Sequence, residues 1–180
     1  MNTERIEQRL AELPLYSYFW IDPKDLEFSS RIRWICEHEC PMYGKTWACP
    51  PGVGEVDACK CRCLSYPECL MITTVVEVED IADIEQTLAT RPDHEAVTDQ
   101  VLQILRDEGL DVYVLSTEAC AICDRCAILD GQPCRHPERM HPCVESHGIV
   151  LSQVAEDNGV PFQYGDNVVT WFSLLFFKEK

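Results

Sequence analysis

Four runs of apolar or β-branched residues are spaced along the chain, and each is bounded by Pro, Gly, Asp or Asn. Runs of this length and composition are typical of buried strands. They cover residues 15–21, 70–78, 111–115 and 168–177. The sequence therefore predicts about four strands.

The segments between these runs repeat apolar residues at helical spacing. The clearest segment is 92–108, where Pro92 suits the first turn and Gly109 a C-terminal stop. Further helices are expected at the acidic N-terminus, over 55–66, and from Pro142 to about Gly159. Strands that alternate with helices predict the α/β class: a single-layer sheet of about four strands flanked by helices, with two cysteine-rich metal-binding loop regions. No linker or repeat is visible, so residues 1–180 are predicted to form one cysteine-rich metal-binding domain.

Composition makes sulfur the unusual feature of the chain. A chain of 180 residues can bury a core without covalent cross-links, yet it contains twelve cysteines. The N-terminus has no signal-peptide pattern, and the longest apolar run, residues 168–177, is too short to span a membrane. The protein is therefore expected in the cytoplasm. In that reducing compartment, cysteines are more often metal ligands than disulfides.

The charge balance restricts the possible partners. The 15 basic and 31 acidic residues give a formal net charge of −16. Such a surface repels phosphate backbones and anionic lipid headgroups, so nucleic acid and membranes are not expected partners. The expected partner is a redox protein with a basic docking patch.

The second group of cysteines has metal-ligand spacing. Cys120, Cys123 and Cys126 form two overlapping C-x2-C pairs, and Cys134 and Cys143 follow. A two-residue spacer lets two sulfurs turn toward one metal. Three close thiolates and a distant fourth beside a proline resemble the loops that hold a cubane iron–sulfur cluster. Four-cysteine zinc sites use the same turn, so zinc is the main alternative.

The first group contains seven cysteines: Cys36, Cys40, Cys49, Cys59, Cys61, Cys63 and Cys69. A radical-SAM motif would need a cysteine at position 43, which is Tyr43. No cysteine has the histidine spacing that would complete a Rieske site. H-E-x-x-H, Walker and G-x-G-x-x-G motifs are also missing from the sequence, so nucleotide binding has no support.

Several short elements occur together in a specific order. They are Tyr-Gly-Lys-x-Trp-x-Cys-Pro-Pro at 43–51, Cys-Asp-Arg-Cys at 123–126, Pro-Cys-Arg-x-Pro-Glu at 133–138, residues 145–148 and Tyr164-Gly165. In these elements the chain resembles the predicted metal-binding family called domain of unknown function 2284, over roughly residues 15–177. The resemblance implies iron–sulfur or other metal binding in anaerobic microbes, and implies no particular reaction.

The resemblance also implies a set of ligands. It gives Cys36, Cys40 and Cys49 with one of Cys59 or Cys63 for the first site, and Cys120, Cys123, Cys126 and Cys134 for the second. The chain departs from the family pattern at Cys143, where Ser is usual, and in its run Cys59, Cys61 and Cys63. These departures leave the fourth ligand of each site open.

The cysteines outside the two tetrads have alternative interpretations. Cys69 is expected to be a small buried hydrophobe, while Cys61 is equally consistent with burial or with a place near a site. Cys143 follows Pro142 at the expected start of a helix, where the helix N-terminus would lower its pKa. It is therefore predicted to be a free, activated thiol. On this basis Cys134→Ser should lose the second cluster and Cys143→Ser should keep all the iron.

Some residues near the ligands are candidates for supporting roles. Lys45 and Arg135 flank ligand positions and are expected to bind the cofactor by stabilising its negative charge, although both could be ordinary surface cations. Trp47 and Tyr43 are expected to fill the core rather than to shield a cluster. His38 and His136 are minor candidates for ligands, because a histidine of this kind is more commonly an ordinary surface residue.

The leading hypothesis is an iron–sulfur protein with two four-cysteine sites, each holding a [4Fe–4S] cluster, that transfers electrons or senses redox state in anaerobic metabolism. One alternative is an enzyme that reduces a small molecule or a corrinoid at a cluster. Another is a structural or interaction module whose loops are held by zinc. Colour and redox activity separate the last from the other two, because zinc has neither.

Overall fold

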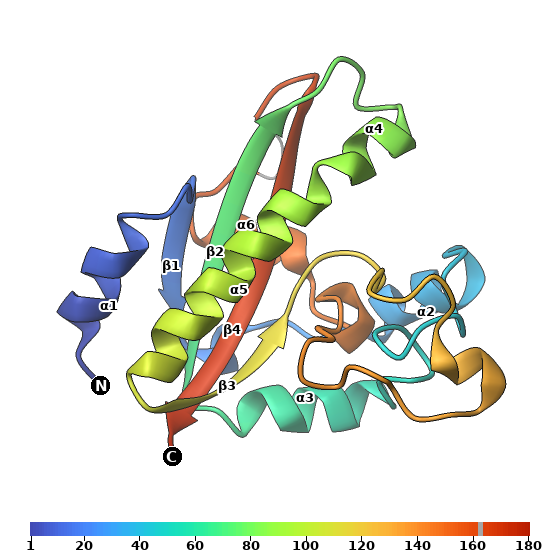
Figure 1. Cartoon of the computed structure of the whole chain (residues 1–180), viewed down its shortest axis with the longest axis horizontal. Helices are drawn as coiled ribbons and strands as arrows, with labels where there is room; N and C mark the ends of the chain where they lie inside the picture. The colour runs from blue at the N-terminus through green and yellow to red at the C-terminus, as the bar shows by residue number, and fades with distance from the viewer. Residues whose placement is uncertain (162–163) are drawn as a thin grey trace.

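A single antiparallel sheet forms the centre of the protein. In the computed structural model, which describes residues 1–161 and 164–180, the strands are β1 (Ser17–Ile21), β2 (Glu68–Glu77), β3 (Leu110–Leu115) and β4 (Val168–Glu179). Their order across the sheet is β1-β2-β4-β3, and each neighbouring pair is antiparallel (Figure 1). The predicted sheet of about four strands with flanking helices is confirmed.

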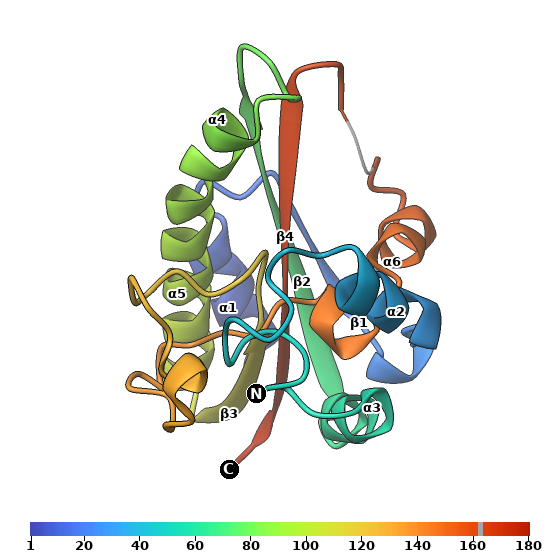
Figure 2. The same ribbon diagram turned by 90° about the vertical axis from the view of Figure 1, so that its right-hand side faces the viewer.

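Alternation along β2 and β4 gives the sheet two buried faces. Successive side chains of a strand point to opposite faces. Leu70 belongs to one core cluster, whereas the next residue, Met71, belongs to the other. Their partners on β4, Leu175 and Leu174, divide in the same way. Both faces therefore need a covering layer, as Figure 2 shows.

One face is covered by α1 (Thr3–Leu10), α4 (Ile84–Ala89) and α5 (Arg91–Asp107) (Figure 2). Ile6 and Leu10 of α1 are fully buried, in one cluster with Val101 and Leu105 of α5. Asn2 caps α1 by accepting a hydrogen bond from the backbone amide of Arg5. Both long helical patterns expected on this side are present, with ends shifted by a few residues.

The other face is covered by α3 (Val56–Leu64), α6 (Leu151–Asp157) and the 3₁₀ turn η3 (Glu145–His147), while η1 (Pro23–Asp25) lies beside α3. The helix expected from Pro142 begins only at Leu151. The cause is Gly148, whose φ of +77° ends the η3 turn where a side chain would meet Val56 and the Ser29 carbonyl. Helix α2 (Ser30–His38) was not predicted from the sequence. No helix in the described ranges is long and apolar enough to cross a membrane.

A buried histidine joins α5 to the sheet. His94 is 1 % exposed, and its Nδ1 and Nε2 lie 2.8 Å from the Thr74 hydroxyl and 2.9 Å from the Ser173 hydroxyl. Burial disfavours the charged imidazolium and lowers the pKa of His94 to about 4. The histidine is therefore neutral in the folded protein at neutral pH.

We expect His94 to make the protein less stable in weak acid. The unfolded chain binds a proton at His94 below its ordinary pKa of 6.5, whereas the folded chain does so only near pH 4. The contribution of neutral His94 to the free energy of unfolding is thus complete above pH 6.5. It is lost as the pH falls from 6.5 toward 4, at about 1.4 kcal/mol per pH unit. Urea titrations at several pH values should show this slope. It should be smaller in His94→Gln and unchanged in His38→Gln, whose side chain is exposed; equal slopes in all three proteins would contradict the assignment.

Candidate metal centres

Cysteines from both groups gather at one end of the molecule, beyond the end of β3. The segment after β3 and the α2 region, far apart in the sequence, lie side by side there (Figure 1). Two pockets open between them, and each is lined by four cysteines. They are called the first and second pocket below.

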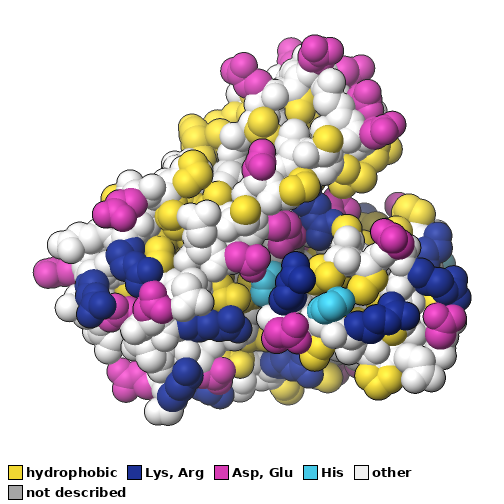
Figure 3. All heavy atoms as spheres, in the orientation of Figure 1, with side chains coloured by type: hydrophobic (Ala, Val, Ile, Leu, Met, Phe, Trp, Pro, Cys, Tyr) yellow, Lys and Arg dark blue, Asp and Glu magenta, His cyan; other side chains and the backbone are white. Residues whose placement is uncertain are grey.

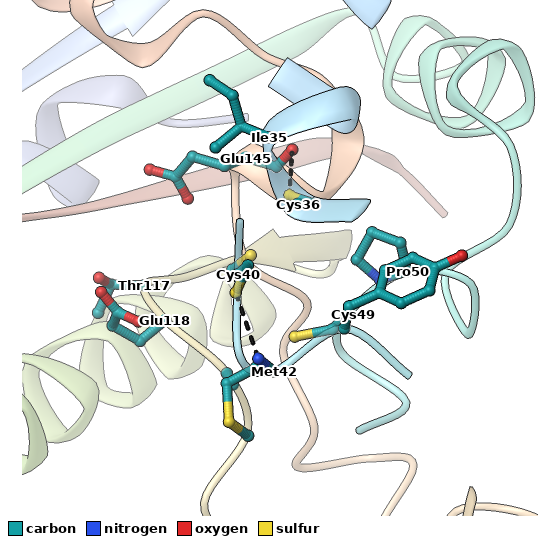
Figure 4. A pocket seen from close by; sticks show the side chains of 12 residues that line it. Ile35, Cys36, Cys40, Met42, Cys49, Pro50, Thr117, Glu118 and Glu145 are labelled. Atoms are coloured by element: carbon teal, nitrogen blue, oxygen red, sulfur yellow. Dashed lines mark hydrogen bonds between the residues drawn. The ribbon is translucent and has the colours of Figure 1, made fainter. Parts of the chain in front are cut away.

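The first pocket is a cavity of about 300 Å³. Its cysteines are Cys36, Cys40, Cys49 and Cys143. Figure 4 shows the sulfurs of Cys36, Cys40 and Cys49 turned toward the same space, with Glu118 and Glu145 at its edge. The pocket thus joins the three ligands expected for the first site with a cysteine that was not expected there.

Helix α2 places the first two sulfurs. Ser29 caps the helix by accepting a hydrogen bond from the backbone amide of Arg31. Cys36 lies in the last turn, and Cys40 follows the end of the helix one turn later, which brings both to one side. The backbone amide of Met42 points at the Cys40 sulfur at 3.4 Å (Figure 4). Amide donors of this kind stabilise a thiolate in a metal site.

Cys143 is held beside Cys49 by backbone pairing. Ser116, just beyond β3, forms a parallel bridge with Cys143, and the Val144 amide donates to the Ser116 carbonyl at 3.0 Å. On its other side, the Cys143 amide lies 3.4 Å from the Ala48 carbonyl. Cys143 is thereby fixed between the end of β3 and the loop that carries Cys49.

The two thiols shift each other's pKa in opposite directions. A hydrogen bond from Cys143 lowers the pKa of Cys49 to about 7, and the same bond, with burial, raises the pKa of Cys143 well above its ordinary value. The expectation that Cys143 has a lowered pKa at a helix N-terminus is wrong, because the chain there forms η3 rather than the start of α6. Burial also raises the pKa of Cys36 to about 11.

The structure places Cys59 and Cys63 elsewhere. Both lie on α3, and within the described ranges neither lines the first or the second pocket. Cys59 points at the Val53 carbonyl, 3.4 Å away, and Cys63 is fully buried in the core, where burial raises its pKa to about 12. Cys69 is a buried core residue, as expected, and Cys61 is exposed.

The second pocket brings together Cys120, Cys123, Cys126 and Cys134. Its cavity is about 10 Å³, which is room for about one water molecule. The His136 amide points at the Cys134 sulfur at 3.4 Å, and a hydrogen bond from the Ile122 backbone favours the thiolate of Cys120. Burial nevertheless has the larger effect on Cys120 and raises its pKa.

A tight turn returns the chain to the C-x2-C pairs. The 3₁₀ helix η2 (Ala127–Asp130) ends at Gly131, whose φ of +63° suits a residue without a Cβ. Beyond it, the Gln132 carbonyl accepts a hydrogen bond from the Trp47 indole at 3.0 Å. Arg135 donates to the Arg125 carbonyl at 2.8 Å. These bonds hold the loop that brings Cys134 to the pocket lined by the other three cysteines.

The non-cysteine candidates lie at different pockets. Arg135, His136 and Trp47 line the second pocket, so Trp47 shields a candidate site instead of filling the core. Tyr43 lines the first pocket. Lys45 is exposed and lines neither pocket within the described chain.

His38 lines neither pocket within the described residues. Its ring stacks on exposed Trp34 with centroids 4.4 Å apart, and one ring nitrogen lies 2.9 Å from the Trp34 carbonyl.

The two pockets share a wall. Ala119 lines the first pocket and the next residue, Cys120, lines the second. Glu118, just before them, has a φ of +58°, a left-handed conformation that is uncommon for residues other than glycine and that clusters at functional sites. This turn lets consecutive residues serve both pockets.

The donor sets determine which metals would fit. Four thiols suit zinc or an iron–sulfur cluster and are poor ligands for hard cations such as magnesium. Across the described residues, no three His, Cys, Asp or Glu side chains converge closely enough to hold an ion as they stand. Metal binding therefore requires the cysteine side chains to turn inward from their present rotamers.

Residues 19–177 match the family model described as predicted metal-binding protein (DUF2284). The chain belongs to this family. The resemblance seen in its motifs is thereby confirmed, and the family description supports a metal cofactor without giving its type. Searches of curated proteins and of solved structures find no match to this DUF2284 chain.

Proposed function

We propose that this DUF2284 protein is an iron–sulfur protein with two four-thiolate sites that transfers electrons in a reducing cytoplasm. The observation that carries the proposal is the presence of two separate pockets, each lined by four cysteines. Iron–sulfur clusters in proteins are held by four cysteine thiolates and supply one-electron redox chemistry. The chain's own contribution is to provide the sulfurs, amide donors to them, and walls that limit contact with water.

For the first site we propose Cys36, Cys40, Cys49 and Cys143 as ligands. A single zinc ion lies only about 2.3 Å from each of four sulfurs, so it would leave much of the 300 Å³ cavity unfilled. A cluster, with several metal and sulfide atoms, makes better use of that volume. Cys143 replaces Cys59 and Cys63 in the proposal because they lie on α3, away from the cavity.

For the second site we propose Cys120, Cys123, Cys126 and Cys134, with Arg135 beside them as a cation that offsets their negative charge. The overlapping C-x2-C spacing supports a cluster. A single zinc ion is the second candidate here, and the cavity of about 10 Å³ favours it. A cluster at this site would require the loop to open.

The proposed partner is a redox protein with a basic docking patch. The chain has a formal net charge of −16, and bound thiolate clusters would add to it. In Figure 3 acidic side chains gather on the projecting upper arm. This arm carries the exposed residues Glu79, Asp80, Asp83 and Glu85.

The test is anaerobic purification followed by iron, sulfide and zinc analysis, with EPR spectra of the reduced protein. Two [4Fe–4S] clusters give about eight iron and eight sulfide ions per chain. One cluster and one zinc ion give about four iron, four sulfide and one zinc per chain. Either result supports an iron–sulfur protein, and the difference between them tells whether the second site holds a cluster or a zinc ion. Colourless protein with zinc alone would refute it. For the electron-transfer role, the bound iron must also undergo reversible reduction.

A further inference from the structure

Arg33, on α2, is a buried cation without an anionic partner in the described chain. Only 6 % of the residue is exposed. Its guanidinium donates to the Gly54 carbonyl at 2.8 Å and to the Ser146 carbonyl at 2.6 Å, and it lies 3.9 Å from the Cys59 sulfur. Its Nε is buried and has no hydrogen-bond partner within the described residues. All the groups that it contacts are formally neutral as described.

A buried charge of this kind is costly. Moving a guanidinium out of water is compensated only when an opposite charge and hydrogen bonds replace its hydration. Carbonyl oxygens supply hydrogen bonds but no net charge. The position therefore favours an anion close by when the protein is in its working form.

Arg33 borders a surface pocket with Glu55 and Lys60 rather than the first pocket, and its link to the first site runs through α2 and η3. Arg33 precedes Cys36 by three residues, so both lie on neighbouring positions of one helix face. They also approach consecutive carbonyls of η3: the Cys36 sulfur is 4.0 Å from the Glu145 carbonyl, and Arg33 bonds the next one, that of Ser146. The guanidinium and the sulfur of a proposed ligand thus contact neighbouring peptide groups of one turn.

A further observation agrees with this placement. The one acidic side chain of η3, Glu145, directs its carboxyl group away from Cys36 (Figure 4), and no ion pair joins it to Arg33 in the described chain. Glu145 is therefore not the counterion.

We propose that Arg33 is the buried countercation of the first site and sets its reduction potential. The inference rests on the proposed function, because it requires a redox-active anionic group at Cys36, Cys40, Cys49 and Cys143. Reduction adds one negative charge at that site, and a fixed nearby cation stabilises the reduced form. Arg33 is a positioning residue that acts through charge, without being a ligand.

The experiment compares Arg33→Gln, Arg33→Lys and Arg31→Gln in anaerobically prepared protein. Gln keeps an N–H donor for the carbonyls but removes the charge, whereas Lys keeps the charge. Arg31 lies on the same helix with its side chain exposed, which makes it the matched control. The readouts are iron and sulfide content and the midpoint potential of the EPR signal that Cys143→Ser abolishes.

Arg33→Gln is expected to keep its iron and to lower the equilibrium constant for reduction about tenfold, which is about 59 mV for a one-electron couple. Arg33→Lys should restore most of that difference, and Arg31→Gln should match the wild type. If Arg33→Gln binds no iron while Arg33→Lys does, charge is again the deciding property.

Three results would overturn the inference: an unchanged midpoint in Arg33→Gln, equal shifts in the Gln and Lys variants, or loss of iron from both. The last two would assign Arg33 a purely geometric role. Failure of the proposed function is distinguishable, because the wild-type protein would then contain no reducible iron at all.

Discussion

Cys143→Ser is expected to remove the metal of the first site and to leave the second site loaded. Backbone pairing to Ser116 holds Cys143 in the cavity, and its thiol hydrogen-bonds to Cys49. A serine hydroxyl is a much poorer ligand for iron than a thiolate, so the tetrad would lose one of its four sulfurs. We expect iron and sulfide each to fall by about four per chain, with loss of one EPR signal. This reverses the sequence-based expectation that Cys143→Ser keeps all the iron.

Two variants complete this test. Cys61→Ser, at an exposed position of α3, should keep the full metal content. Cys134→Ser should lose the metal of the second pocket and keep the signal that Cys143→Ser abolishes. A Cys143→Ser protein with wild-type iron and sulfide would show that the first tetrad is completed by another residue.

Phe176→Ala is expected to destabilise the protein by about 3–5 kcal/mol, which is a large part of the stability of a typical domain. Phe176 is fully buried on β4, an inner strand of the sheet. It is paired in register with Cys69 on one side and with Tyr113 on the other, and its ring lies 6.4 Å from that of Tyr113. Truncation would leave a cavity enclosed by two strands and the layer around α6, with little freedom to collapse.

Denaturant unfolding of metal-free protein would measure this loss. The matched control is Phe19→Ala, the same chemical change on the edge strand β1, where the ring is only partly buried. Phe19→Ala should lower the free energy of unfolding by clearly less, because part of its ring is already in contact with water. Similar losses for both variants would mean that the edge strand β1 is packed as well as the inner strand β4 on this face.

The sheet could be predicted from the sequence because its strands carry their signal locally. Runs such as 168–177 are apolar over their whole length, which indicates burial on both faces. Helix α2 gives no such signal. Its only fully buried residue is Arg33, while Trp34 and Ile35 are exposed, so apolar periodicity could not reveal it. Ser29 as an N-cap was the one local sign of its start.

The two candidate sites also differ in whether their sequence signal is local. The second tetrad lies within one loop. Its C-x2-C spacing predicted three of the cysteines that line the pocket, and the resemblance to the family supplied the fourth, Cys134. The first tetrad depends on Cys143, which reaches Cys49 through a parallel bridge to Ser116 between segments distant in the sequence. No spacing rule reports such a contact. The cysteines on α3 are much closer in the sequence and were therefore the natural candidates for the fourth ligand, but they do not line the cavity.

The wall common to the two pockets links them thermodynamically. A metal that fixes Cys120 in the second pocket would also fix the peptide group before it. That peptide group belongs to Ala119, which lines the first pocket. Part of the conformational entropy that either site must lose on loading is therefore lost once for both. If both sites hold metal, this shared loss predicts positive cooperativity, and by linkage each metal would raise the affinity of the chain for the other by the same factor. Partly loaded protein should accordingly be a minor species during reconstitution.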